Sequence, residues 1–249
     1  MKFLRMFELP KSKEIVMIDL KEYKRVLTFF AHPDDETLAA GGTIHKLTSL
    51  GAEVHIAIPA TGIHSRRNTQ ENKKRDTDLI ELRKDCEKAM AVLGVQPANI
   101  YLGSFPDNEM DKHSLLEVIH WLEEIIKRVK PELVLTHHRF CTNIDHQHCH
   151  EAVVVATRPG LNEHVTVLCG EVPSSTGYLK PVQWEPNLYV ELSEHNVESK
   201  IKAMETYKGE ARPDPHPRSR EVLNALAKVR GSEAGFYFAE SFMISKIFA

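Results

Sequence analysis

Two kinds of apolar pattern alternate along most of the chain. Short runs rich in β-branched and aromatic residues are typical of buried parallel strands, whereas longer stretches with apolar residues three or four positions apart are typical of helices. The first kind predicts strands over residues 26–30, 54–59, 100–103 and 133–136. The second kind predicts helices over residues 37–47, 78–93 and 115–129. This alternation predicts a doubly wound α/β fold with a parallel sheet.

The two ends of the chain carry a less regular pattern. Residues 1–23 are interpreted as an extended arm or edge strand, because they combine Pro10 and several charges with only one short apolar run, at 15–18. In the last third, the patterns predict short strands and loops over 171–176 and 184–192, helices over 194–207 and 220–229, and a closing strand over 236–244. The sequence contains no internal repeat, so we expect a single domain over residues 1–249.

Composition narrows the class of protein. With 249 residues, of which 42% are hydrophobic, the chain is long enough for one large domain with a substantial core. A net charge of -3 gives no general case for binding nucleic acid or an anionic membrane. No apolar run has the length of a membrane span, and the first residues lack a signal-peptide core, so we expect no membrane insertion and a cytoplasmic location. The four cysteines form no CxxC pair, which fits a reducing compartment.

The first chemical signal is the sequence AHPDDE at residues 31–36. It directly follows the first predicted strand, and open α/β sheets bind ligands at the carboxyl ends of their strands. Within four positions, His32, Asp34 and Asp35 supply one imidazole and two carboxylates, a combination that indicates a metal site. A solvated acidic loop is the alternative that this stretch alone leaves open.

A second cluster follows the fourth predicted strand. Residues 137–151 contain several histidines, two cysteines and Asp145, near which we expect a helix to begin. His146 and His150 are four residues apart and share one face of that helix. Because both clusters follow strands of one parallel sheet, we expect them at the same edge of the sheet.

His32, Asp35 and His146 are therefore the expected metal ligands. Two imidazoles and one carboxylate are a typical ligand set for a catalytic zinc, which keeps one position open for water. Such a metal lowers the pKa of the water and polarises a carbonyl oxygen. Asp34 lies beside a ligand without being needed as one, so it is the candidate general base.

Further motifs accompany these clusters, namely TG at 61–62, FPD at 105–107, NIDH at 143–146, EVPSST at 171–176 and HPRS at 216–219. Together with AHPDDE they make the sequence resemble the PIG-L/LmbE-like family of zinc-dependent N-acetylglucosaminyl deacetylases over nearly its whole length. The resemblance implies a Rossmann-like three-layer sandwich, with a mostly parallel sheet and helices on both faces. It also implies Zn²⁺, or another divalent ion such as Fe²⁺, at the three expected ligands, with Asp34 as general base. The implied reaction is hydrolysis of an N-acetyl group on an amino-sugar derivative.

The chain departs from this family at Asn143, where many members have a histidine thought to protonate the leaving group or to steady the oxyanion. Asparagine cannot act as an acid, but its amide can donate a hydrogen bond to an oxyanion. The proton then has to come from Asp34 or from another histidine. His216, held between two prolines, is the candidate, with a structural turn histidine as the alternative. Asp145 is expected to orient His146 or a neighbouring imidazole.

The partner implied by the resemblance is a small N-acetylated sugar conjugate. The residues expected to contact it are Glu36, Arg66, Asp107, His216 and Arg218, with Arg67 as a further cation for an anionic aglycone. Because the family often forms closed oligomers, a homo-oligomer is also left open.

Two other interpretations compete with a deacetylase. The pattern His32-x-Asp34 with a distant histidine also matches the triad of Fe(II)-dependent oxygenases, but those sites belong to mostly β jelly rolls. A catalytically weak module that binds metal and sugar is favoured by Asn143. Retention of Asp34, which binding alone does not require, argues against that module.

Overall fold

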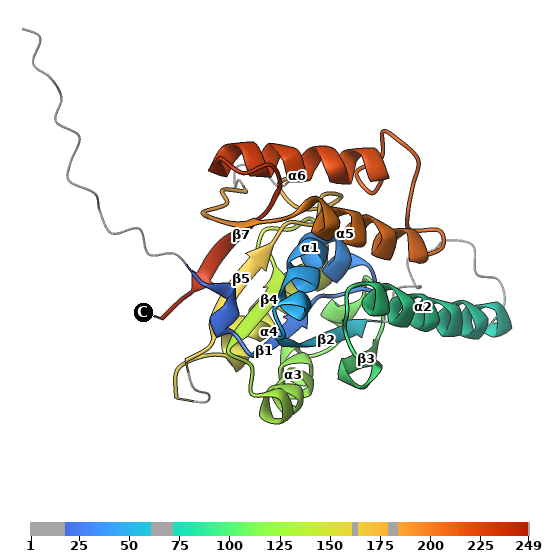
Figure 1. Ribbon diagram of the computed structural model, residues 1–249. Coiled ribbons are helices and arrows are strands. Elements are labelled where there is room, and N and C mark those ends of the chain that lie inside the picture. The colour runs from blue at the N-terminus through green and yellow to red at the C-terminus, as the bar shows by residue number, and fades with distance from the viewer. Residues whose placement is uncertain (1–17, 61–71, 161–163, 179–183, 249) are drawn as a thin grey trace, which may run out of the picture.

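The strands form one mixed sheet. The structure is a computed structural model, which describes residues 18–60, 72–160, 164–178 and 184–248. Within these residues the sheet has seven strands in the order β3-β2-β1-β4-β5-β7-β6 (Figure 1). The strands are β1 (Arg25–Phe29), β2 (Glu53–Ala60), β3 (Ile100–Phe105), β4 (Leu133–His137), β5 (Thr166–Gly170), β6 (Leu188–Glu191) and β7 (Ala239–Lys246). The first five run parallel to one another, and β7 runs antiparallel to both of its neighbours.

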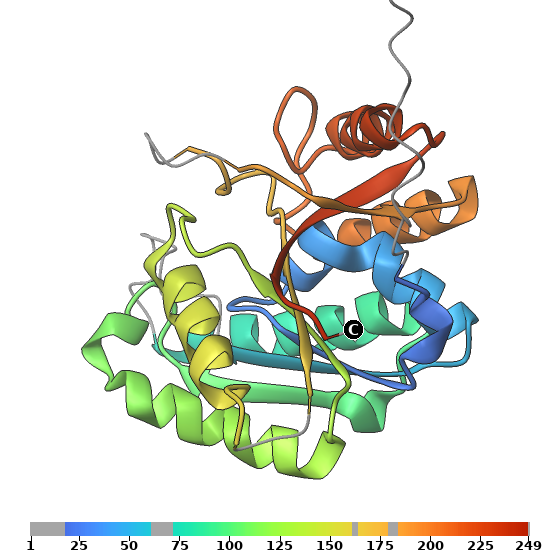
Figure 2. The ribbon, with the colours of Figure 1, turned by 90° about the vertical axis from the view of Figure 1, so that its left-hand side faces the viewer.

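Helices cover both faces of this sheet (Figure 2). One face carries α1 (Asp35–Ser49), α2 (Asn72–Val92), α5 (Glu194–Thr206) and α6 (Arg220–Ala234), and the other carries α3 (Leu115–Val129) and α4 (Ile144–Ala156). Short 3-10 helices span Leu20–Glu22, Pro97–Asn99 and Met110–Lys112. Each face has its own cluster of buried apolar side chains, so the sheet is buried on both sides. The expected three-layer α/β sandwich is confirmed.

Helix α3 shows how local sequence specifies an element. Ser114 and Glu117 form a capping box, in which each side chain accepts a hydrogen bond from the backbone of the other residue. Apolar residues at helical spacing, among them Val118 and Leu122, are fully buried against the sheet. Burying one such side chain stabilises the fold by about 1.5–3 kcal/mol. The predicted range 115–129 is confirmed at both ends.

Several predictions about strands, helices and their boundaries are wrong. Strand β5 was not predicted, and residues 171–176 form a turn region rather than strands. Helix α2 begins at Asn72, within the stretch that polarity assigned to a loop. The last strand begins at Ala239 rather than at residue 236, because residues 236–238 form bends. Most of the expected N-terminal arm, residues 1–17, lies outside the described residues.

Two consecutive glycines let α1 pack closely. A Cβ on Gly42 would lie 2.5 Å from Cδ1 of Leu192, closer than real Cβ contacts allow. The backbone N–H groups of Gly42 and Thr43 donate to the buried Glu240 carboxylate of β7, at 2.9 and 2.7 Å. Lys200 of α5 also donates to that carboxylate, at 2.7 Å. Close packing therefore explains the helix-weakening glycines.

The strand order determines where the two chemical clusters meet. Strands β1 and β4 are neighbours, with Phe29 paired to Thr136. Strand β2 lies on one side of β1 and β4 lies on the other, so the strand order reverses at β1. Such a switch point opens a crevice at the strands' carboxyl ends. Helices α1 and α4 both begin there. No helix among the described residues is long and apolar enough to cross a membrane.

Candidate active site

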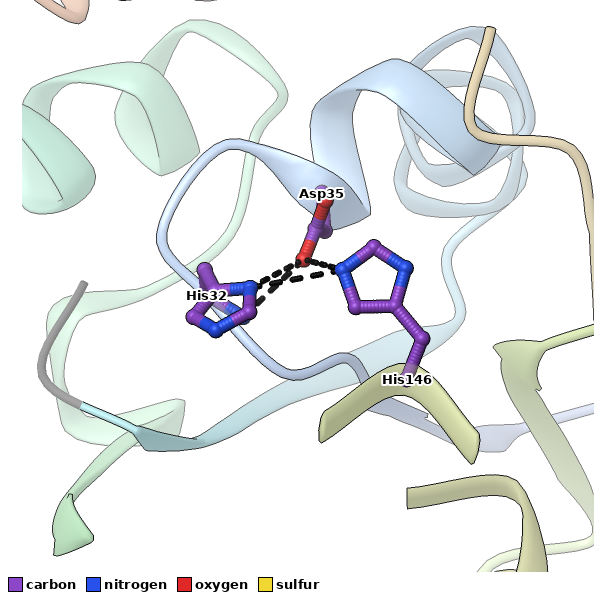
Figure 3. A group of neighbouring side chains, drawn as sticks. All are labelled: His32, Asp35 and His146. Carbon is purple, nitrogen blue, oxygen red and sulfur yellow. Dashed lines mark hydrogen bonds and ion pairs between the residues drawn. The ribbon is translucent and has the colours of Figure 1, made fainter. Parts of the chain in front are cut away.

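Three side chains from the two clusters converge on one point (Figure 3). His32 lies in the turn after β1, Asp35 is the first residue of α1, and His146 lies in the first turn of α4. Asp35 Oδ2 lies 3.1 Å from His32 Nδ1 and 3.0 Å from His146 Nε2. The two imidazole nitrogens are 3.3 Å apart. The three residues predicted to be metal ligands are thus brought together.

The donor set and its spacing fit a divalent metal. Ligand atoms about 2.0–2.1 Å from a tetrahedral zinc are about 3.3 Å from one another, close to the separations found here. Although burial would raise the pKa of Asp35, the charge and hydrogen bonds of His146, together with His32, hold it well below its usual range. Burial opposes protonation of His146, yet the Asp35 carboxylate raises its pKa to about 9. The site therefore attracts positive charge between these three side chains.

The opposite nitrogen of His32 contacts two more carboxylates. His32 Nε2 lies 3.0 Å from Asp107 Oδ1 and 2.9 Å from Asp145 Oδ2. Asp145 also accepts hydrogen bonds from the backbone N–H groups of Asn108, at 2.6 Å, and Met110, at 3.0 Å. These contacts hold the His32 ring so that Nδ1 faces Asp35. From the sequence, Asp145 is expected to orient either His146 or a neighbouring imidazole. In the structure Asp145 contacts the imidazole of His32.

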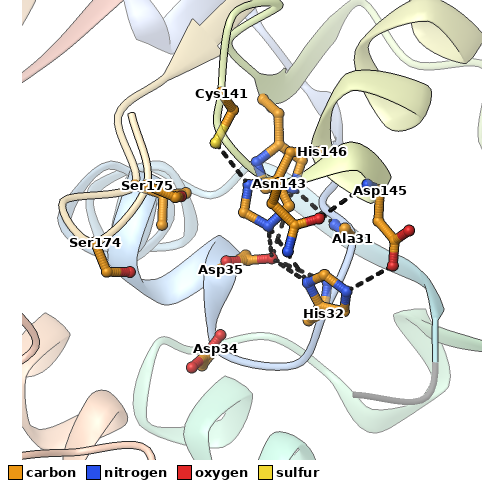
Figure 4. Close-up of polar contacts among 12 residues, drawn as sticks. Ala31, His32, Asp34, Asp35, Cys141, Asn143, Asp145, His146, Ser174 and Ser175 are labelled. Atoms are coloured by element: carbon orange, nitrogen blue, oxygen red, sulfur yellow. Dashed lines mark hydrogen bonds and ion pairs between the residues drawn. The ribbon is translucent and has the colours of Figure 1, made fainter. Parts of the chain in front are cut away.

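His146 is held by two groups that sequence reasoning did not assign to it, and Figure 4 shows the first of them, Cys141. Its Nδ1 lies 3.1 Å from the Cys141 sulfur. Its ring stacks on His137 with 3.8 Å between centroids, and His137 Nε2 accepts the backbone N–H of Ala31 at 2.8 Å. Burial would raise the pKa of the Cys141 thiol, but its hydrogen bond with His146 lowers it overall.

The turn between the two aspartates has an unusual backbone. Asp34 has φ of 115°, a left-handed conformation that costs about 1–3 kcal/mol in a residue other than glycine. Its N–H donates to Glu36 Oε2 at 3.1 Å. Glu36 is fully buried and also accepts from the Thr37 and Tyr207 hydroxyls, each at 2.7 Å. Glu36 therefore stabilises this turn by hydrogen bonds. It is not among the residues that line the cavity described below, although it was expected to contact the substrate.

Asp34 directs its side chain toward Arg218. Arg218 Nη1 lies 2.6 Å from Asp34 Oδ2 and 2.6 Å from Glu210 Oε2. Burial raises the pKa of Asp34 well above its usual range, with Arg218 opposing the rise. A carboxyl group with a raised pKa binds a proton more readily than a free carboxyl group does, which suits a group that takes up and releases a proton. Arg218, which is expected to contact substrate, lines the cavity described below and is also paired with these two carboxylates of the protein.

These side chains open into a polar cavity of about 550 Å³. Its lining is dominated by charged, hydroxyl and amide groups, and consists of His32, Pro33, Asp34, Asp35, Asn108, Thr142, Asn143, His146, Ser174, Ser175, Glu210, Arg212, His216 and Arg218. Sequence reasoning did not assign Ser174, Ser175, Glu210 or Arg212 to the site, although both serines lie in the EVPSST motif. The serines follow β5, so recognising that strand would have placed them at the same edge of the sheet.

The remaining expected site residues differ in their placement. Asn143 lines the cavity and caps α4, since its Oδ1 accepts from the N–H of Asp145 at 2.8 Å, and its amide nitrogen donates to Asn108 Oδ1 at 2.7 Å. His216 is exposed at the cavity. Asp107 is buried against His32 and does not line the cavity. Arg66 and Arg67 lie outside the described residues.

Comparisons with known proteins find matches to both the sequence and the fold of this chain. A family model described as "PIG-L: GlcNAc-PI de-N-acetylase" matches residues 27–157, which include all three converging side chains. Diacetylchitobiose deacetylase of Thermococcus kodakarensis is 28% identical over 88% of this chain and 82% of its own length. A probable N-acetyl-α-D-glucosaminyl L-malate deacetylase of Bacillus cereus is 32% identical over 45% of this chain and 51% of its own length. The solved N,N'-diacetylchitobiose deacetylase of Pyrococcus horikoshii has the same fold, with a TM-score of 0.73, 23% identity and coverage of 90% and 85% of the two chains.

Proposed function

The chain belongs to the PIG-L family of GlcNAc-PI de-N-acetylases, and on that premise we propose that it is a metal-dependent N-deacetylase acting on an N-acetylglucosamine-type amino-sugar derivative. We further propose that residues 1–249 form a single domain of this type. One observation carries the proposal: His32, Asp35 and His146 converge in the lining of a polar cavity, and Asp34 lines the same cavity without belonging to that group.

His32, Asp35 and His146 would hold the metal, with Zn²⁺ as the expected ion and Fe²⁺ as the alternative. The bound metal would lower the pKa of a water molecule and polarise the acetyl oxygen. The relatives named above act on N-acetylated sugars by their names, which supports the same bond as the target here.

Asp34 would act as the proton carrier of the reaction. Its Oδ2 is bound to Arg218, which leaves the other carboxylate oxygen to accept the proton of the attacking water. The same oxygen then returns that proton to the amine nitrogen as the C–N bond breaks, so that acetate and a free amine are the products. Asn143 cannot supply that proton, because an amide is not an acid.

The cavity lining favours a sugar over an apolar amide. The hydroxyls of Ser174 and Ser175 and the charged groups of Glu210 and Arg212 offer the hydrogen bonds that sugar hydroxyls require. A volume of about 550 Å³ lies within the range of small-ligand sites. A small N-acetylated sugar conjugate is therefore the proposed substrate.

One observation favours the second candidate, a catalytically weak module that binds metal and sugar. The amide nitrogen of Asn143 donates to Asn108 Oδ1, so this group is already engaged within the protein. The strained backbone at Asp34 argues for an enzyme, because such conformations cluster at active sites.

Acetate release tests the proposal. The purified protein is incubated with N-acetylglucosamine conjugates, diacetylchitobiose and nucleotide sugars, with and without a chelator, and acetate is measured enzymatically. We expect release from at least one amino sugar, loss of release with chelator, and recovery when Zn²⁺ is added back. A His146→Ala variant is the control for contaminating deacetylases. Metal binding with no acetate released from any substrate would favour the binding module.

A further inference from the structure

We propose that Cys141 is a positioning residue for His146: its sulfur accepts a hydrogen bond from Nδ1 and thereby holds Nε2 toward Asp35. The inference rests on the proposed metal site. It adds a residue to that site that neither the family match nor the sequence motifs point to.

The contact joins two buried side chains. Cys141 Sγ lies 3.1 Å from His146 Nδ1, and Cys141 is fully buried while His146 is only 3% exposed. If Nε2 is the nitrogen that binds a metal, the proton of the neutral ring stays on Nδ1, and this N–H needs an acceptor. Metal-binding imidazoles usually donate this N–H to a carboxylate, a backbone carbonyl or water. Here a thiol sulfur occupies that position.

The sulfur is itself held in place by the helix that carries the imidazole. The backbone carbonyl of Cys141 accepts a hydrogen bond from the Gln147 side chain of α4 at 2.7 Å. The next residue, Thr142, donates its backbone N–H to the carbonyl of Ser175 at 3.1 Å. These two hydrogen bonds hold the C=O and the N–H of the peptide group between Cys141 and Thr142, so the backbone that carries the sulfur is fixed and presents a fixed acceptor to the ring.

Cys141 is placed to orient a ligand and not to be one. It contacts Nδ1, whereas Asp35 and His32 face Nε2 on the opposite edge of the ring (Figure 4). Among the described residues, the side chains close enough to share a metal ion are His32 with Asp35 and His146, and His32 with Asp107 and Asp145. Cys141 belongs to neither group.

Cys149 provides a matched control. Cys149 lies on α4, one turn beyond His146, and is as fully buried as Cys141. It packs in the apolar cluster between α4 and the sheet. Removing its sulfur creates a cavity of the same chemical size without touching the imidazole.

The experiment compares zinc affinity among Cys141→Ala, Cys141→Ser, Cys141→Asp and Cys149→Ala by competition with a chromophoric chelator. We expect Cys141→Ala to weaken zinc binding by about 10- to 100-fold, the usual effect of losing such a partner. Cys141→Ser or Cys141→Asp, which restore an oxygen acceptor, should recover much of this loss, and Cys149→Ala should remain within about twofold of wild type. Thermal unfolding in chelator shows which variants are folded.

Two results would overturn the inference. Zinc affinity of Cys141→Ala within about twofold of wild type would show that the hydrogen bond does not matter. Serine and aspartate variants as weak as alanine would show that the sulfur only fills space. In both cases wild-type zinc binding leaves the proposed function intact, whereas a wild-type protein that binds no zinc overturns both proposals.

Discussion

Replacing Asp34 with asparagine tests the proposed division of labour between the two adjacent aspartates. The substitution keeps the size of the side chain and removes its ability to carry a proton. Asp34 is not among the three converging side chains, so metal content should not change. Its partner Arg218 keeps a second carboxylate, because Glu210 Oε2 lies 2.6 Å from the same guanidinium nitrogen. We therefore expect a folded, metal-loaded protein.

The magnitude follows from the role of a general base. Positioned acid–base groups contribute about 10²- to 10⁴-fold to rate, which corresponds to about 3–5.5 kcal/mol of activation free energy. The effect should lie at the upper end if Asp34 carries the proton both to and from the reacting atoms, because Asn143 supplies no acid to replace it. The loss should appear in kcat, with KM changed little.

The assay measures acetate release and bound metal on the same preparation. Asp111→Asn, at an exposed position, is the control for the change in charge. An Asp34→Asn variant with more than about a tenth of wild-type kcat would refute the proton-carrier role. A variant that loses metal together with activity would show instead that Asp34 helps to hold the ion.

Two further outcomes follow from the structure. Gly42→Ala should destabilise the protein by about 1–3 kcal/mol in denaturant titration despite the better helix propensity of alanine, since its Cβ would lie 2.5 Å from a leucine methyl group. Gly41→Ala should cost less, because its Cβ would lie 3.0 Å from its nearest neighbour, Cγ of Lys200, a less severe overlap than at Gly42; equal costs would contradict this. In chelated protein, the pKa of His146 is about 9 despite burial, because of Asp35. As this exceeds the unfolded value of about 6.5, the stabilisation, up to about 3 kcal/mol, is complete below pH 6.5 and is lost as pH rises through 9. In urea titrations we expect His146→Ala to lower the free energy of unfolding more at pH 6 than at pH 10. An equal decrease at both pH values would refute this pH dependence.

The part of the fold built from strand and helix repeats could be predicted from the sequence. In β1 and β4 the apolar run, the following polar turn and the next helix all point to the same assignment. Strand β5 was not predicted, because its apolar run is short and is followed by a turn rather than a helix. A five-residue apolar run has no periodicity that separates a strand from a buried helical segment.

The candidate ligands could be predicted because each lies in the turn or in the first helical turn that follows a strand, where topology brings them to the same edge of the sheet. The orientation of Glu36 could not, since it depends on Tyr207, 171 residues away. Arg218 pairs with Asp34 across 184 residues. Local sequence shows that such side chains are charged or polar, but it does not show whether a residue far away in the chain forms an ion pair or hydrogen bond with them.

The contact between Glu240 and the backbone of α1 has a consequence for how the protein is made. The carboxylate that seats this helix lies 198 residues after Gly42, on the last strand. During synthesis on the ribosome, the first chemical motif emerges well before its anchor, because 198 residues separate Gly42 from Glu240. Stalled or prematurely ended chains would therefore carry the motif without a seated helix behind it.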